Sequence, residues 1–267
     1  MWIDGKPLGT QPYGYTSFTY ELTNLTNPTH LPNLTNLTDG SDPHTLSDPH
    51  TISVRVDNRG SNSRWYSGSG IYRHVRLTLL PKLAIAREGV VVTTPVVVIS
   101  DEARRVARDT AVPASFGAAA TVIVTVSVEN MGDAVNDAKI EISIARKGST
   151  TPIESRTVSG LSFSARSTTA VNVTFEMSQP ALWSPATPSL YTTSVYLADG
   201  VGGAVAGGAA SVAVVFGVRS FSFDSSNGFL INGASTKLKG GCVHHDNGPL
   251  GAAIDGQILT LRCTYIY

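Results

Sequence analysis

Residues 238–253 read LKGGCVHHDNGPLGAA and place two histidines and an aspartate side by side in a glycine-rich loop. A neutral histidine can hydrogen-bond a polar ligand through either ring nitrogen. Histidine and aspartate also ligate metals, and a histidine can equally be buried and hydrogen-bonded without any ligand. We therefore take His244, His245 and Asp246 as the candidate binding residues and keep these three interpretations open.

The sequence contains no conventional metal-binding pattern. Cys242 and Cys263 are the only cysteines and no CxxC spacing occurs, so we expect no structural zinc site. Whether these two thiols pair stays open. His30, His44 and His50 lie in a repetitive tract that would not fix ligand geometry, so we predict no metal cluster there.

Charge and hydropathy exclude several classes of partner. The 267 residues include 20 basic and 20 acidic side chains and carry no formal net charge, which indicates neither nucleic acid nor an anionic membrane. The longest apolar run, GVVVTTPVVVIS, is interrupted by Thr and Pro and is too short to cross a bilayer. The first residues, MWIDGKPLG, carry Asp4 and Lys6 where a signal peptide would be apolar, so the compartment stays unassigned.

Alternation of apolar and polar residues predicts a mostly β protein with strands spaced as in a sandwich. The stretches that alternate or are rich in β-branched residues are HTISVRVDN, RHVRLTLL, TVIVTVSVEN, AKIEISIAR, AVNVTFEM, LYTTSVYL and ASVAVVFGVRSF. A helix of one or two turns is predicted around DEARRVARD. An Asn-Gly turn within SFSFDSSNGFLINGAS predicts a small hairpin.

Two segments are of low complexity. Residues 22–51 repeat NLT and SDPHT and are rich in Asn, Thr, Pro and Asp, so they cannot bury an apolar face. We predict a disordered surface insertion there, between two strands. ADGVGGAVAGGAAS is predicted to be an elongated connection within a hairpin.

Four motifs, in order along the chain, resemble glycoside hydrolase family 2, which comprises β-galactosidases, β-glucuronidases and β-mannosidases. MWIDGKPLGTQPYGYTSFTYEL and NSRWYSGSGIYRHVRL resemble two stretches of the family's N-terminal sugar-binding sandwich. LWSPATPSLYTTSVYL resembles strands of its immunoglobulin-like sandwich. FGVRSFSFDSSNGFLINGASTKLKGGCVHHDNGPLGAA resembles the junction into its (β/α)8 barrel, and its HHDNGPLGAA portion is most similar to the β-galactosidase branch.

The resemblance implies a domain organisation. Residues 1–80 would be the C-terminal part of a jelly-roll-like sugar-binding β-sandwich, interrupted by the 22–51 insertion. Residues 81–217 would form an immunoglobulin-like β-sandwich, and residues 218–267 the truncated start of a TIM-barrel catalytic domain. The last residues, IDGQILTLRCTYIY, lack the apolar stripe of the barrel's first helix. We therefore expect a truncation or a mispredicted gene end there, with LTLRCTYIY an apolar strand that has nothing to pair with. The start, MWIDGK, likewise opens in mid-strand.

The resemblance also implies a chemistry. The family hydrolyses β-glycosides with retention, which needs two carboxylates about 5–5.5 Å apart. In family members both are glutamates on later barrel strands. Residues 218–267 contain no glutamate, and the last one in the chain is Glu176. We therefore assign no catalytic residue and predict a catalytically incomplete chain, which leaves open whether it is an enzyme. No cofactor is assigned either, although some family members bind sodium or magnesium.

The same resemblance implies which residues contact sugar. The position matching His244 faces the substrate pocket at the barrel mouth, with His245 and Asp246 beside it. A polar position that is Asp in some members falls on Asn62 or Ser63 here, and neither is charged. The weaker sugar-contact candidates are Asn62, Ser63, Arg64 and Trp65. The alternative role for the RWY cluster is a structural corner of the sandwich.

Three hypotheses about function stay open. The first is a piece of a β-galactosidase-like glycosidase, with β-glucuronides or β-mannosides as alternative substrates. The second is a carbohydrate-binding or structural β-sandwich module, and the third is a non-functional gene fragment. A β-linked carbohydrate is the expected partner under the first two hypotheses, and the oligomeric state is not predicted.

Overall fold

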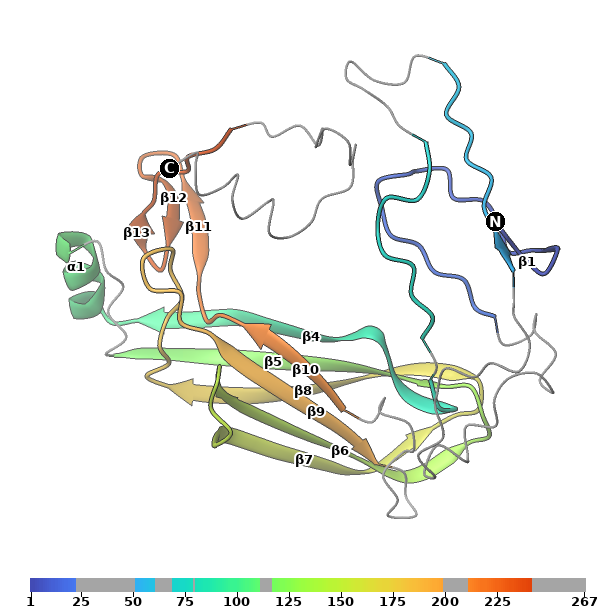
Figure 1. The fold of residues 1–267 in the computed structure, drawn as a ribbon. Coiled ribbons are helices and arrows are strands. Elements are labelled where there is room, and N and C mark those ends of the chain that lie inside the picture. The colour runs from blue at the N-terminus through green and yellow to red at the C-terminus, as the bar shows by residue number, and fades with distance from the viewer. Residues whose placement is uncertain (23–50, 61–68, 79, 111–116, 199–210, 242–267) are drawn as a thin grey trace. The chain divides into compact units, whose positions relative to one another are not determined.

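A computed structural model describes residues 1–22, 51–60, 69–78, 80–110, 117–198 and 211–241 (Figure 1). The chain divides into two compact units. Unit 1 comprises Met1–Leu77 together with Gly241–Tyr267, and unit 2 comprises Thr78–Gly240. The predicted insertion, apart from its end residues, and most of the predicted ADGVGG connection lie outside the described residues.

Unit 2 is built on two antiparallel sheets, of three and four strands. In spatial order the first sheet contains β4 (Leu83–Ile99), β5 (Ala118–Asn130) and β8 (Ser167–Ser178). The second sheet contains β10 (Ser211–Phe216), β9 (Tyr191–Ala198), β6 (Val135–Arg146) and β7 (Pro152–Phe163). The two sheets share one hydrophobic core, so they form a sandwich.

Alternation along the central strands explains this core. In β5 every second residue from Ala118 to Asn130 is buried, and Val122, Val124, Val126 and Val128 are fully so. In β6 the buried partners are Ile140, Ile142 and Ile144. Since successive side chains of a strand point to opposite faces, each strand contributes one apolar face. The prediction of a mostly β sandwich is confirmed.

Two strands of the sandwich, β4 and β7, were absent from the predicted set, and both lie at sheet edges. β4 contains Pro95, which removes a ladder donor and is tolerated at an edge. The pairing of β4 with β5 shifts register between Thr93 and Val96 and again between Ile85 and Val90. β7 begins at Pro152 and is mostly exposed, so it lacks the strict alternation of a half-buried strand.

A helix and a small sheet complete unit 2. Helix α1 (Asp101–Thr110) forms where one or two turns were predicted, and Ser100 Oγ accepts a hydrogen bond from the Ala103 amide (3.2 Å). The predicted hairpin forms from β11 (Phe221–Asp224) and β12 (Gly228–Ile231), with β13 (Ala234–Ser235) added beside β12.

Unit 1 has little regular structure within the described residues. Its strands are β1 (Trp2–Ile3), β2 (Lys6–Pro7) and β3 (Ile52–Ser53), paired in the order β2-β1-β3. Ile3 is the one buried hydrophobic residue in the described part of this unit. The prediction of a strand across RHVRLTLL is wrong for its described residues, and HTISVRVDN forms only β3. Alternation alone does not make a strand where no second strand supplies hydrogen bonds.

No helix in the described ranges is long and apolar enough to cross a membrane.

Candidate functional site

The two sets of predicted sugar-contacting residues lie outside the described residues. His244, His245 and Asp246 belong to the 242–267 segment. Asn62, Ser63, Arg64 and Trp65 belong to the 61–68 segment. Their roles therefore stay predictions, and the described geometry concerns the elements that lead to them.

A hydrogen-bonded joint in unit 2 precedes the histidine loop. Asn232 is only 1% exposed and directly follows β12. Its backbone amide donates to the Ser220 carbonyl, and its Oδ1 accepts from the Ser220 amide, both at 2.9 Å. Its Nδ2 donates to the Trp183 carbonyl at 3.0 Å. The hairpin is thus fixed to the loop that precedes β9.

Trp183 is packed into this joint. Its amide donates to the Val218 carbonyl (2.8 Å), and the Arg219 guanidinium carbon lies 4.6 Å from the centre of its ring. Gly217 lies so close that a Cβ there would be 2.8 Å from the Trp183 Cβ. These contacts hold the Trp183 side chain and backbone against the segment Gly217–Arg219. A sugar-stacking surface needs an open ring face, and Arg219 covers one face of this ring.

Sequence reasoning did not single out Asn232 or Arg219. The Asn-Gly dipeptide at Asn232–Gly233 signals a turn, and both residues have positive φ (53° and 79°). The bond from Asn232 to Trp183 spans 49 residues, so no local pattern could have predicted it.

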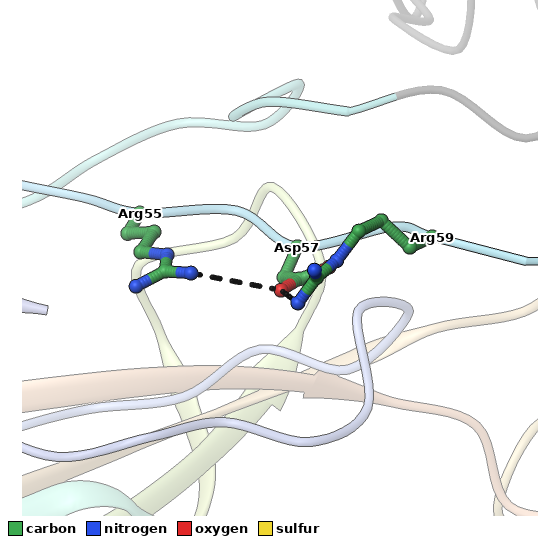
Figure 2. Close-up of polar contacts among 3 residues, drawn as sticks. All are labelled: Arg55, Asp57 and Arg59. Carbon is green, nitrogen blue, oxygen red and sulfur yellow. Dashed lines mark hydrogen bonds and ion pairs between the residues drawn. The ribbon is translucent and has the colours of Figure 1, made fainter.

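Carboxyl groups are the second candidate source of glycosidase chemistry. Among the described residues, the carboxyl groups with a displaced pKa are Asp57, Glu102 and Asp224. In Asp57 the hydrogen bonds from Arg59 lower the pKa (Nε–Oδ1 2.8 Å and Nη2–Oδ2 2.6 Å), assisted by Arg55 at 3.8 Å. Figure 2 shows the three side chains on the same side of the chain.

The other two displaced carboxyl groups are also held in the charged form. Hydrogen bonds from Arg105 lower the pKa of Glu102, and the Asn227 side chain, then the Ser226 and Asn227 amides, lower the pKa of Asp224. A glycosidase acid needs the opposite shift, because it must hold a proton near neutral pH. Glu176, the last glutamate, accepts hydrogen bonds from Thr121 Oγ1 (2.9 and 3.1 Å) on the neighbouring strand.

No cluster of three or more His, Cys, Asp or Glu side chains suited to a metal occurs within the described ranges. The described residues of unit 2 form a two-sheet core and the hydrogen-bonded joint around Asn232. By its two antiparallel sheets and single core, unit 2 is an immunoglobulin-like β-sandwich domain.

Comparison with known proteins shows which family this scaffold resembles. Residues 105–219 match the family model described as Glycosyl hydrolases family 2. Beta-galactosidase BoGH2A of Bacteroides ovatus is 32% identical over 97% of this chain and 26% of its own length. A putative beta-glucuronidase of Formosa agariphila is 29% identical over 95% of this chain and 20% of its own length.

Solved structures agree with this assignment. A crystal structure of a glycosyl hydrolase family 2 member from Bacteroides cellulosilyticus matches with a TM-score of 0.75 and 28% identity, covering 98% of this chain and 28% of that one. By these matches the chain is similar to members of glycosyl hydrolase family 2. It spans about a quarter or less of the length of the curated relatives it matches (26% and 20%).

Proposed function

We propose that this chain supplies accessory β-sandwich domains of an enzyme that hydrolyses terminal β-galactosides with retention, and that it does not itself hold the catalytic pair. The observation that carries the proposal is the match to a protein named a beta-galactosidase along 97% of this chain. Residues 1–80 would be the C-terminal part of its sugar-binding sandwich, residues 81–217 its immunoglobulin-like sandwich, and residues 218–267 the start of its barrel.

The electrostatics of the described carboxyl groups supports the second half of the proposal. Retaining hydrolysis needs a nucleophile and an acid/base about 5–5.5 Å apart, the latter with a raised pKa. The displaced carboxyl groups within the described ranges are shifted the other way, because each is stabilised as an anion by Arg or amide donors. Residues 218–267 contain no glutamate.

The proposed role of the histidine loop is to contact the substrate. His244 would hydrogen-bond a sugar hydroxyl, with His245 and Asp246 beside it. The joint around Asn232 supports this role, because it fixes the chain shortly before the loop begins. A binding loop of this kind works best when a rigid element positions it.

A second substrate class is favoured by one observation. A relative named a putative beta-glucuronidase matches 95% of this chain at 29% identity, close to the 32% of the beta-galactosidase. β-Glucuronides are therefore the alternative substrates. A non-catalytic carbohydrate-binding module is the alternative function.

The test compares the product of the gene's full reading frame with the 267-residue chain. The transcript is sequenced, and the product of its full reading frame is assayed on chromogenic β-galactoside, β-glucuronide and β-mannoside, beside the 267-residue chain. We expect the full product to favour the galactoside and the chain alone to show background hydrolysis. Preference for the glucuronide would support the alternative substrate, and turnover by the chain alone would contradict the proposal.

A further inference from the structure

The small hairpin of unit 2 contains two Asn-Gly dipeptides whose asparagines have different surroundings. Asn227 lies in the turn between β11 and β12 and is exposed, and Gly228 follows it with a φ of 72°. Asn232 directly follows β12 and is only 1% exposed, and Gly233 follows it with a φ of 79°. A third such dipeptide, Asn247–Gly248, lies outside the described residues. One hairpin therefore holds the same local sequence in an open and in a closed setting.

An Asn-Gly dipeptide can lose its side-chain amide without an enzyme. In the first step the Gly228 amide nitrogen gives its proton to a base in solution and attacks the Asn227 Cγ. The new N–Cγ bond forms as the Cγ–Nδ2 bond breaks, and ammonia leaves with a proton supplied by the solvent. Water then opens the five-membered imide at either carbonyl, which gives aspartate or isoaspartate without oxidation or reduction. A following glycine favours the reaction because it has no Cβ to hinder the approach of the backbone nitrogen.

The fold opposes this reaction at Asn232. Its Oδ1 accepts from the Ser220 amide (2.9 Å), and its Nδ2 donates to the Trp183 carbonyl (3.0 Å). The Asn232 side chain must leave both partners before the Gly233 nitrogen can reach its Cγ. Because the site is buried, the freed amide and carbonyl would then lack partners, and an unmade buried hydrogen bond is costly.

The restraint on Asn227 is weaker. Its Nδ2 donates to Asp224 Oδ2 at 3.0 Å, and both residues are exposed. When the Asn227 side chain turns toward Gly228, water can solvate the carboxylate and the amide that separate. A Cβ built on Gly228 meets no atom within 4 Å, so the turn is also open around the attacking nitrogen.

We propose that Asn227 is a modification site, at which the folded chain is deamidated to aspartate and isoaspartate through the cyclic imide, and that the joint protects Asn232 in the same hairpin. This chemistry is separate from the proposed glycosidase function. It changes the tip of the hairpin and leaves the hydrogen bonds that fix the hairpin to the sandwich in place.

Deamidation at Asn227 alters the electrostatics of the turn. Asp224 Oδ1 accepts from the amides of Ser226 (2.6 Å) and Asn227 (3.1 Å), and its Oδ2 accepts from Asn227 Nδ2. The product lacks the Nδ2 donor and carries a second carboxylate near Asp224, so it raises the pKa of Asp224. In the isoaspartyl form the main chain also runs through the former side chain, which lengthens the turn.

The unaltered 267-residue chain provides the direct test. It is incubated at mildly alkaline pH and digested under acidic conditions, and its peptides are mapped by mass spectrometry, with isoaspartate identified by electron-transfer fragmentation. We expect Asn227 to convert at least about tenfold faster than Asn232, because one net hydrogen bond corresponds to roughly a factor of five and the unpaired buried groups add to it.

The matched control is the same chain unfolded in guanidinium, where both asparagines lie in flexible Asn-Gly segments and should convert at similar rates. Equal rates in the folded chain would overturn the proposal. Conversion of Asn227 in the unfolded chain but not in the folded chain would overturn it as well, because the native turn would then protect both sites.

A product mimic tests the effect on the turn. Asn227→Asp should raise the NMR titration midpoint of Asp224, and Asn172→Asp, at an exposed asparagine of β8, should leave that midpoint unchanged. An unchanged midpoint in Asn227→Asp would show that conversion of Asn227 does not act on Asp224 and would refute that part of the proposal.

Discussion

Asn130 closes the end of β5 and is fully buried. Its Nδ2 donates to the carbonyls of Asp133 (2.7 Å), Ser164 (3.0 Å) and Phe163 (3.2 Å). Its Oδ1 accepts from the Gly132 amide at 3.0 Å. This single side chain therefore joins the turn after β5 to the turn between β7 and β8.

Asn130→Ala should destabilise the sandwich by roughly 3 kcal/mol. Two amide hydrogens and one acceptor make about three net hydrogen bonds, each contributing about 1 kcal/mol. Because one Nδ2 serves three carbonyls, at least one of these bonds is shared, so the value is not larger. For a unit of this size, about 3 kcal/mol corresponds to a Tm lower by roughly 6–12 °C.

The assay is thermal and urea unfolding of the full chain followed by far-UV circular dichroism. Asn172→Ala is the matched control, because Asn172 is an exposed asparagine in the same sandwich that accepts one hydrogen bond, from Thr125 Oγ1 (2.7 Å). Asn172→Ala should lower the free energy of unfolding by less than about 1 kcal/mol. If both variants lose the same stability, the reasoning about Asn130 is wrong.

Three further outcomes follow from other positions in unit 2. Thr193 Oγ1 is buried and has no hydrogen-bond partner within the described structure, so Thr193→Val should leave Tm unchanged or raise it. A decrease of more than about 1 kcal/mol in the free energy of unfolding would contradict this expectation. Gly217→Ala would place a Cβ 2.8 Å from the Trp183 Cβ, so it should lower the free energy of unfolding by about 1–3 kcal/mol and change tryptophan fluorescence. An unchanged Tm would contradict close packing at this position. The pKa of Asp224 lies below its ordinary value of 3.8, chiefly through the Asn227 side chain, so its stabilising effect is present above that ordinary value and is lost as pH falls through the folded-state pKa. An NMR titration should show the low midpoint and an upward shift in Asn227→Ala, and an ordinary midpoint would contradict the turn geometry.

The sequence predicted the central strands because burial there follows strict alternation, as in Val122 to Val128 of β5. It did not predict β4, where Pro95 and two register shifts break the pattern. It predicted a strand at residues 73–80 that the described residues lack, because a local pattern does not supply a pairing partner. The joint around Asn232 depends on contacts between residues far apart in the chain, which local patterns do not encode.

Under the proposed function, the 267-residue chain does not hold a nucleophile and acid/base pair of its own. Retaining glycosidases form a covalent glycosyl-enzyme intermediate, which an activated 2-fluoro-galactoside traps. The most direct measurement is the intact mass of the 267-residue chain after incubation with this reagent. We predict an unchanged mass. A stoichiometric adduct of one glycosyl unit, lost when a single carboxylate is replaced by its amide, would contradict the account.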